Sequence, residues 1–248
     1  MTQTEPQNDT IYTYREPQSQ EELEVLLKIR YKSFIRGYWD LVTPKNIYEM
    51  DIDAFDVNAI HFGLFIWENN IEKPIGYVRC VTENEAKHAV WIKNILEKCP
   101  ELNIPPAQFS LPLQGKLESK DLPVLQDFMD EQKNKNYDIV EVSRITVDEN
   151  YTSIGILYVF SDFVFCTNYS ENAYYLLTSK TILEKAYVKN GFVRMDHLSF
   201  YIAKELHYLY YVTAKMLPEA NHNKIDAMHQ LYQQNKSITF NLTKQTYA

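Results

Sequence analysis

The segment from Asp138 to Asp148, DIVEVSRITVD, carries charged side chains inside an apolar pattern. Its β-branched residues are typical of a buried strand, yet Glu141 and Arg144 interrupt them. Burying a carboxylate or a guanidinium is costly unless the group is paired or used. A buried carboxylate can serve as a general base, and a guanidinium can bind a carboxylate through two hydrogen bonds. An edge strand with a solvated face explains the segment about as well, so both interpretations stay open.

The geometry of a strand decides which of these side chains can meet. Regular alternation places Glu141 and Ser143 on one face and Arg144 on the other. A bulge between them would change this arrangement. The alternative to catalysis is that Glu141 only pairs with Arg144 or with Arg79, which lies in another predicted strand.

The composition excludes several function classes. The chain has 248 residues, 45% of them hydrophobic, and a net charge of −8 with a pI near 5.3. An acidic chain argues against a nucleic-acid partner. The histidines show no metal-ligand spacing, and the three cysteines contain no CxxC pair, which indicates reduced thiols and no metal site. Residues 1–10 show no signal-peptide pattern and no apolar run reaches ~18 residues, so we expect a cytoplasmic protein without a transmembrane segment.

The elements that must position these residues can be predicted from apolar periodicity and from turn and cap signals. Strands are predicted at 11–15, 60–67, 75–81, 138–148, 173–178 and 192–202. Helices are predicted at 20–34, 85–98, 123–133, 153–167, 179–190, 203–217 and 219–234. We expect a disordered lead-in at 1–10, one α/β domain at 11–202 with an insertion at about 82–135, and a C-terminal helical extension at 203–248.

Several motifs precede the Asp138 to Asp148 strand in a fixed order. They are Arg30 and Phe34 on the first helix, Trp39, the D-x-x-D loop of Asp53 and Asp56, and the G-x-x-R strand of Gly76 and Arg79. Together with Glu141, Ser143 and Arg144 as E-x-S-R, the set resembles the acyl-homoserine lactone synthases and N-acyl amino acid synthases of the GNAT acyltransferase superfamily. The resemblance implies a mixed, mostly antiparallel central sheet flanked by helices. The insertion and the C-terminal helices are more similar to N-acyl amino acid synthases and exosortase-associated acyltransferases.

The resemblance also implies roles. Glu141 is the expected base, with Ser143 beside it, and Tyr187 in AYVKNGF resembles the GNAT tyrosine that protonates the leaving sulfur. Substrate binding is the expected role of Arg30, Phe34, Trp39, Asp53, Asp56, Arg79 and Arg144. The alternatives are a structural ion network for the arginines, a helix cap or solvated loop for the aspartates, and packing for Tyr187.

The segment after the E-x-S-R strand indicates the acyl donor. Enzymes of this superfamily that use coenzyme A carry an R/Q-x-x-G-x-G/A loop for the pyrophosphate, whereas Tyr151 to Ile156 retains one glycine and no Arg or Gln. This favours an acyl-phosphopantetheine thioester on an acyl carrier protein over acyl-coenzyme A, with no permanently bound cofactor. Basic residues that could dock an acidic carrier protein are Lys180, Lys185, Lys189 and Arg194, unless they form only a solvated helix face.

The leading hypothesis is therefore an N-acyltransferase that joins a fatty acyl chain to the α-amine of an amino acid. One alternative is synthesis of an acyl-homoserine lactone from S-adenosylmethionine. Another is a non-catalytic acyl-binding or partner-binding module that retains the fold.

Overall fold

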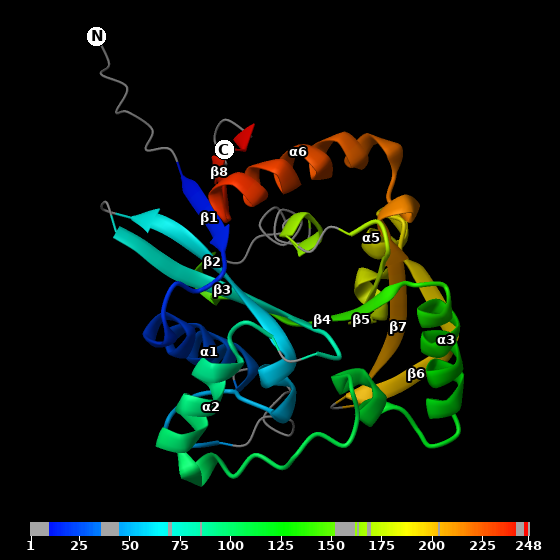
Figure 1. The fold of residues 1–248 in the computed structure, drawn as a ribbon, viewed down its shortest axis with the longest axis horizontal. Coiled ribbons are helices and arrows are strands. Elements are labelled where there is room, and N and C mark those ends of the chain that lie inside the picture. The colour runs from blue at the N-terminus through cyan, green and yellow to red at the C-terminus, as the bar shows by residue number, and fades with distance from the viewer. Residues whose placement is uncertain are drawn as a thin grey trace.

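The computed structural model describes residues 10–35, 45–68, 71–84, 86–151, 162, 164–167, 170–202, 204–241 and 246–247. These residues form one nine-stranded sheet with helices on both faces (Figure 1). Neighbouring strands follow the order β6-β7-β5-β4-β3-β2-β1-β8-β9. Within the described residues, every neighbouring pair is antiparallel except β4 and β5. The predicted mixed α/β fold with a mostly antiparallel sheet is confirmed.

The strands are β1 (Ile11–Arg15), β2 (Ala59–Glu68), β3 (Ile71–Val81), β4 (Asp138–Val147), β5 (Ala173–Lys180), β6 (Val193–Ile202), β7 (Glu205–Thr213), β8 (Ser237–Asn241) and β9 (Thr246–Tyr247). The α-helices are α1 (Gln20–Ile35), α2 (Ala89–Lys98), α3 (Leu122–Asn134), α5 (Glu184–Lys189) and α6 (Glu219–Asn235). Short 3-10 helices include η2 (Ala54–Asn58), η4 (Pro112–Lys116) and η6 (Thr181–Leu183). None of the helices within the described ranges combines the length and apolar character that a membrane crossing needs.

The sheet opens between β4 and β5. These parallel strands pair only from Asp138 to Glu141 and from Ala173 to Leu176, although both continue beyond. Past that point β4 stays paired with β3, and β5 stays paired with β7. The two strands therefore diverge after Glu141, and we call this opening the fork.

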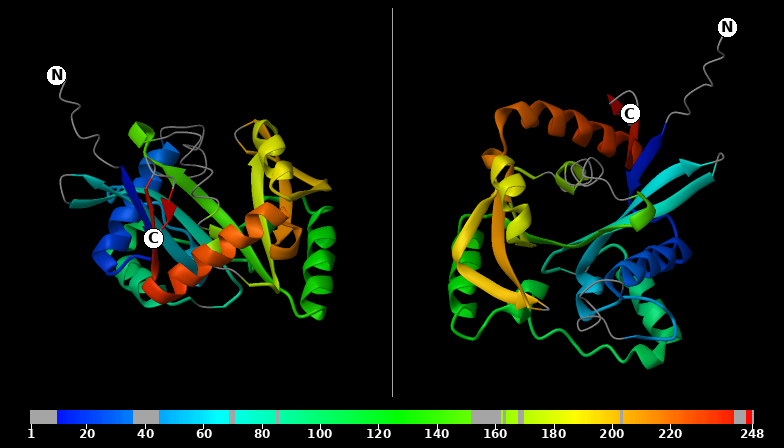
Figure 2. Two further views of the ribbon diagram at one scale, coloured as in Figure 1. Left: turned by 90° about the horizontal axis from the view of Figure 1, so that it is seen from above. Right: turned by 180° about the vertical axis from the view of Figure 1, so that it is seen from behind.

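The two faces of the sheet carry different helices. In Figures 1 and 2, α1 and α2 lie on one side of the sheet and α6 lies on the other. The α6 face buries Val140 and Val142 of β4 together with Met228 and Tyr232 of α6. On the α1 face, Ile139 packs with apolar residues of η4, α3 and β5. Alternation along β4 thus directs Glu141, like Ile139, toward the α1 face.

The segment between β3 and β4 contributes helices to the α1 face. Helix α2 packs its Ile92 and Ile95 against Leu23 and Leu27 of α1. Leu113 of η4 joins the buried cluster that contains residues of α3 and β4. The three cysteines, Cys80, Cys99 and Cys166, are buried, and no disulfide joins them in the described part of the chain.

The predicted helical extension at 203–248 is wrong in its first part. Residues 205–213, ELHYLYYVT, form strand β7, which lies between β5 and β6. A nearly continuous run of apolar and aromatic residues has neither clear helical nor clear strand periodicity. Here the run forms a strand that pairs with β5 on one side and with β6 on the other. The second predicted helix is confirmed as α6, but the chain then forms β8, which pairs with β1.

Other predictions differ in extent. The predicted helix at 179–190 is shortened to η6 and α5, because β5 continues to Lys180. The remaining predicted strands and the helices at 20–34, 85–98 and 123–133 are found with shifted ends. The predicted lead-in at 1–10 and the predicted helix at 153–167 fall mostly outside the described residues.

Candidate functional site

A bulge in β4 shapes the site. Arg79 of β3 pairs with Ser143, whereas Tyr77 pairs with Thr146, so one residue of β3 opposes both Arg144 and Ile145. Arg144 has φ = 59°, a left-handed conformation that residues with a Cβ rarely adopt. Such strain persists where surrounding contacts hold the residue in place. The simple alternation predicted for Ser143 and Arg144 therefore does not apply.

Gly76, the first residue of the G-x-x-R motif, lies where the neighbouring strands leave little room for a side chain. A Cβ on this residue would lie 3.0 Å from the backbone oxygen of Thr146 and 3.2 Å from the Cβ of Leu64. The close approach of β2 and β4 on either side of Gly76 keeps β3 in the register that presents Arg79.

The D-x-x-D motif caps the 3-10 helix η2. The Asp53 side chain accepts a hydrogen bond from the Phe55 N–H at 3.0 Å, and the Asp56 carboxylate accepts one from the Asp53 N–H at 2.7 Å. This reciprocal arrangement is a capping box. The same two carboxylates also accept hydrogen bonds from arginines.

Arg30 and Arg79 bind these aspartates in the protein interior. Arg30 donates to Asp51 at 2.5 Å and to both Asp56 oxygens at 2.7 and 3.2 Å. Arg79 donates to both Asp53 oxygens at 2.6 and 2.8 Å and to Asp56 at 2.8 Å. We call Arg30, Arg79, Asp51, Asp53 and Asp56 the paired cluster. Because it joins α1, η2 and β3, it fixes the α1 side of the site.

Within the paired cluster, the arginines determine the direction in which the pKa values of the aspartates shift. Burial by itself raises the pKa of Asp56, but the guanidiniums of Arg30 and Arg79 outweigh it and hold that pKa well below its usual range. The pKa of Asp53 is also lowered, because Arg79 outweighs burial. These carboxylates remain ionised and satisfied.

His61 and Tyr77 complete the buried network behind Arg30. Arg30 donates to the Tyr77 hydroxyl at 3.1 Å, and that hydroxyl lies 2.7 Å from Nδ1 of His61. The other ring nitrogen, Nε2, lies 3.0 Å from the Asp56 carbonyl oxygen. Burial lowers the pKa of His61 to about 4, so the ring is neutral, with Nε2 donating to the carbonyl and Nδ1 accepting from Tyr77.

Arg144 and Ser143, which lie at the bulge of β4, contact residues of the paired cluster. The Arg144 guanidinium lies 3.2 Å from Asp51 and 3.4 Å from Asp53, and its Cζ lies 5.0 Å from the centre of the Phe34 ring. Ser143 accepts a hydrogen bond from Arg79 Nε at 3.0 Å. The structure thus brings together the predicted residues Arg30, Phe34, Asp53, Asp56, Arg79, Ser143 and Arg144. Trp39 lies outside the described residues.

Glu141 lies beside this cluster but has different partners. Its side chain is buried, and one carboxylate oxygen accepts a hydrogen bond from the Leu113 N–H of η4 at 2.8 Å. Burial raises the pKa of Glu141 and outweighs the opposing effects of Lys116 and of this hydrogen bond. Among the described residues, Glu141 makes no salt bridge with Arg79 or Arg144. A raised pKa at the fork is the property expected of a general base.

Lys116, at the end of η4, is a charged neighbour of Glu141 that the sequence motifs did not indicate. Its ammonium lies 5.9 Å from the centre of the Phe200 ring. Burial lowers the pKa of Lys116, against the opposing effect of Glu141. The insertion therefore supplies both a hydrogen-bond donor and a cation to the surroundings of Glu141.

Tyr187 lies on the other face of the sheet. Its ring packs on Phe192 and Tyr210, with centroid distances of 5.2 and 5.6 Å, and it adjoins the apolar cluster of the α6 face. Burial raises the pKa of its hydroxyl, which is hydrogen-bonded to Ser179 of β5. Ser179 lies beyond the part of β5 that pairs with β4, so Tyr187 borders the fork from the side opposite Glu141.

The predicted docking residues lie on β5, α5 and β6. Lys180 pairs with Glu205, and Arg194 pairs with Glu184 at 2.6 Å and Asp196 at 2.7 Å. Lys185 and Lys189 are exposed on α5, one turn apart. These two lysines are the accessible part of the predicted basic surface.

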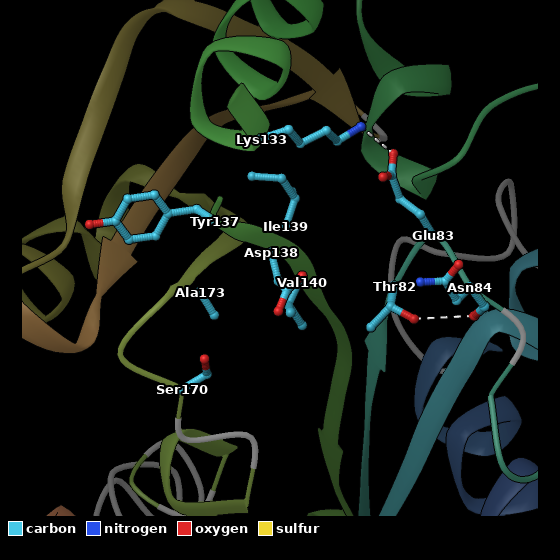
Figure 3. Close-up of a pocket in the computed structure, with 10 residues that line it drawn as sticks. All are labelled: Thr82, Glu83, Asn84, Lys133, Tyr137, Asp138, Ile139, Val140, Ser170 and Ala173. Atoms are coloured by element: carbon cyan, nitrogen blue, oxygen red, sulfur yellow. Dashed lines mark hydrogen bonds and ion pairs between the residues drawn. The ribbon is translucent and has the colours of Figure 1, made fainter. Parts of the chain in front are cut away.

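A hollow of about 290 Å³ lies at the other end of β4 (Figure 3). Its lining includes Asp138, Ile139 and Val140 of β4, and Glu83 and Lys133 form a 2.6 Å ion pair beside it. This is the end at which β4 and β5 are still paired, so the hollow lies away from the fork and from Ser143 and Arg144.

Comparisons with known proteins give only distant likenesses. No family model and no curated protein matches the chain. It is similar to the solved structure of an acyl-CoA N-acyltransferase from Pseudomonas aeruginosa, with a TM-score of 0.46 and 12% identity over 81% of this chain and 97% of the other. It is also similar to BjaI, a CoA-dependent acyl-homoserine lactone synthase, with a TM-score of 0.47 and 14% identity over 83% of this chain and 81% of the other. A third similar structure is FeeM, an N-acyl amino acid synthase from uncultured soil microbes, with a TM-score of 0.41 and 10% identity over 90% of this chain and 97% of the other.

These are structures of the kind that the motifs predicted. Because the likenesses are distant, we derive the function of this chain from its own site. Sequence reasoning missed Lys116, Tyr77 and His61, which carry no motif, while Asp51 was visible only as one of several acidic residues before η2.

Proposed function

We propose that this protein is an N-acyltransferase that transfers a fatty acyl chain from an acyl carrier protein thioester to the α-amine of an amino acid. The observation that carries the proposal is the position of Glu141. It is a buried carboxylate with a raised pKa at the point where β4 and β5 diverge, and the arginines beside it are occupied by aspartates.

The fork suits a thioester arm. Beyond Glu141, the described part of β4 is paired with β3 alone, so its other edge presents backbone N–H and C=O groups toward the opening. A phosphopantetheine arm contains two amides that can pair with such an edge, in the manner of an added strand. An arm lying in the fork has access to both faces of the sheet.

The two faces can then supply the two proton transfers of aminolysis. On the α1 face, Glu141 accepts a proton from the acceptor's ammonium, and the free amine attacks the thioester carbonyl carbon. Glu141 releases the first proton to solvent and then takes the second N–H proton as the tetrahedral intermediate collapses to the amide, and the C–S bond breaks to expel the thiolate. On the α6 face, the Tyr187 hydroxyl donates a proton to this sulfur. A base or acid within reach contributes about 10²- to 10⁴-fold in rate.

A carrier protein is the donor that the chain favours. The sequence from Tyr151 to Ile156 has no Arg or Gln and only one glycine, where coenzyme A-dependent enzymes of the GNAT superfamily carry their pyrophosphate-binding motif. Exposed Lys185 and Lys189 on α5 supply positive charge near the end of β5, where the fork opens. An acidic carrier protein would dock there and pass its arm toward Glu141.

The proposal is tested by incubating the protein with acyl carrier proteins that bear long acyl chains and with a panel of amino acids. Mass spectrometry should detect N-acyl amino acids and release of free carrier thiol. Turnover supported only by acetyl-coenzyme A would refute the carrier-protein donor. Release of methylthioadenosine from S-adenosylmethionine would instead indicate lactone synthesis.

A further inference from the structure

Lys116 ends the short helix η4, whose Leu113 N–H binds Glu141, and it does not belong to the paired cluster. Within the part of the chain that the structure describes, its ammonium makes no hydrogen bond and no salt bridge. The residue is half-buried, and Glu141 is the charged group with the largest effect on its ammonium. An ammonium that no carboxylate binds keeps its hydrogen-bond donors for an anion.

The segment that carries Lys116 is held firmly. The Gln114 side chain accepts a hydrogen bond from the Leu111 N–H at 2.9 Å and donates to Gln126 of α3 at 3.0 Å. Within η4, the backbone N–H of Leu113 donates a hydrogen bond to the Glu141 carboxylate. The relative position of Lys116 and Glu141 is therefore set by the fold and does not depend on a bound substrate.

The arginines are poor candidates for binding a substrate carboxylate. Arg30 is fully buried, and Arg79 is 1% exposed, with both guanidiniums donating to aspartates. A substrate anion would have to displace a carboxylate from a buried ion pair, and breaking such a pair costs about 3–5 kcal/mol. This argues against Arg30 and Arg79 as the groups that hold an amino-acid carboxylate.

An α-amino acid carries its ammonium and its carboxylate on one carbon. A site that recognises both groups therefore needs an anion and a cation side by side. Glu141 and Lys116 form such a pair, and the Phe200 ring next to Lys116 stacks on His207 with a centroid distance of 6.0 Å, forming an aromatic wall.

We infer that Lys116 binds the α-carboxylate of the acceptor while Glu141 takes the proton from its amine, so that this pair selects α-amino acids over simple amines. The inference rests on the proposed function and identifies the α-carboxylate as the substrate group that this site recognises. Lys116 acts here as a binding residue, and no bond to it forms or breaks.

The test is the substitution Lys116→Met, which keeps most of the length of the side chain and removes its charge. The acceptors are phenylalanine and 2-phenylethylamine, which differ only in the carboxylate. For Lys116→Met we expect KM for phenylalanine to rise about tenfold or more and KM for 2-phenylethylamine to change by less than about twofold. Lys116→Arg should retain part of the discrimination. Lys120→Met, at an exposed lysine that pairs with Glu118, is the matched control and should behave as wild type.

Equal losses with both acceptors would overturn the inference, because Lys116 would then act on Glu141 or on the fold. A loss specific to phenylalanine in Arg144→Met but absent in Lys116→Met would also overturn it. Binding without donor, measured by calorimetry with the same two compounds, separates this inference from the proposed function. Carboxylate-dependent binding that Lys116→Met abolishes supports the site even if no acyl transfer occurs, whereas equal binding of the two compounds by wild type refutes it.

Discussion

Two groups of charges meet at β4, and they differ in how their charges are used. In the paired cluster, each buried arginine binds two or more carboxylate groups at hydrogen-bond distance. Glu141 and Lys116 lie on the same face, but each keeps capacity for a further partner. The first group holds α1, η2 and β3 in place, and the second is suited to chemistry.

The pKa values express this difference. Arginines hold the pKa of Asp53 and Asp56 below the usual range despite burial, whereas burial prevails at Glu141 and raises its pKa. A carboxylate whose pKa is depressed and which is already bound by guanidiniums is a weaker base than one whose pKa is raised by burial. Carboxylates at similar depth thus have pKa values shifted in opposite directions, and the difference lies in their partners.

The largest expected effect is on stability, in Asp56→Asn. This change removes the charge that Arg30 and Arg79 share and leaves buried guanidiniums underpaired. We expect a loss of about 3–5 kcal/mol in the free energy of unfolding, measured by urea titration. Asp130→Asn, on the exposed side of α3, is the control and should change it by less than about 0.5 kcal/mol. A loss below about 1 kcal/mol in Asp56→Asn would mean that the paired cluster does not hold the fold.

The paired cluster also predicts how stability depends on pH. Because the folded-state pKa of Asp53 and Asp56 is depressed, their stabilisation is fully present above the unfolded value of about 3.9. It is lost as pH falls through the lower folded-state values, since the unfolded chain then binds more protons. Urea titrations from pH 7 downward should show stability falling in acid, with a shallower fall in Asp56→Asn. Parallel curves for the two proteins would contradict this assignment.

The docking surface is expected to give an intermediate effect. Replacing Lys185 and Lys189 of α5 by glutamate should weaken carrier-protein binding about tenfold, mainly by slowing association at low salt. The matched control is the same double replacement at Lys28 and Lys32 of α1, which are also exposed and one turn apart but lie on the other face. Surface plasmon resonance can compare the variants, and equal affinities would exclude α5 as the docking site.

Ser143→Ala should have the smallest effect. It removes the acceptor for Arg79 Nε at 3.0 Å, which we expect to cost about 1 kcal/mol of stability. If Ser143 only orients Arg79, kcat should stay within about threefold of wild type. A larger fall in kcat with unchanged stability would place Ser143 among the reacting groups.

Part of this site could be predicted from sequence because its motifs resemble those of a known family. Arg30, Asp53, Asp56 and Arg79 were predicted from that resemblance, and they meet in the structure although each arginine lies at least 23 residues from these aspartates in the chain. The bulge at Arg144 could not be placed, since regular strand alternation does not reveal an inserted residue. Lys116 gave no signal, because its position beside Glu141 comes from the fold of a proline-rich insertion without periodicity.

The fold shows the same limit. Elements with clear periodicity or caps, such as α1 and β4, were predicted, whereas β7 was predicted as a helix because its apolar run has no clear period. That error matters for the site, since β7 supports β5 along the fork and carries His207 beside Phe200.

The most direct test of the central claim is Glu141→Gln, followed by turnover against pH together with urea unfolding. Gln keeps the acceptor for the Leu113 N–H and removes the charge, so stability should be equal to or above that of wild type. Turnover should fall at least about tenfold, and the decline of wild-type turnover at low pH, centred above the ordinary glutamate value of about 4.3, should disappear. Unchanged turnover with the acid limb retained would contradict the assignment of Glu141 as the base.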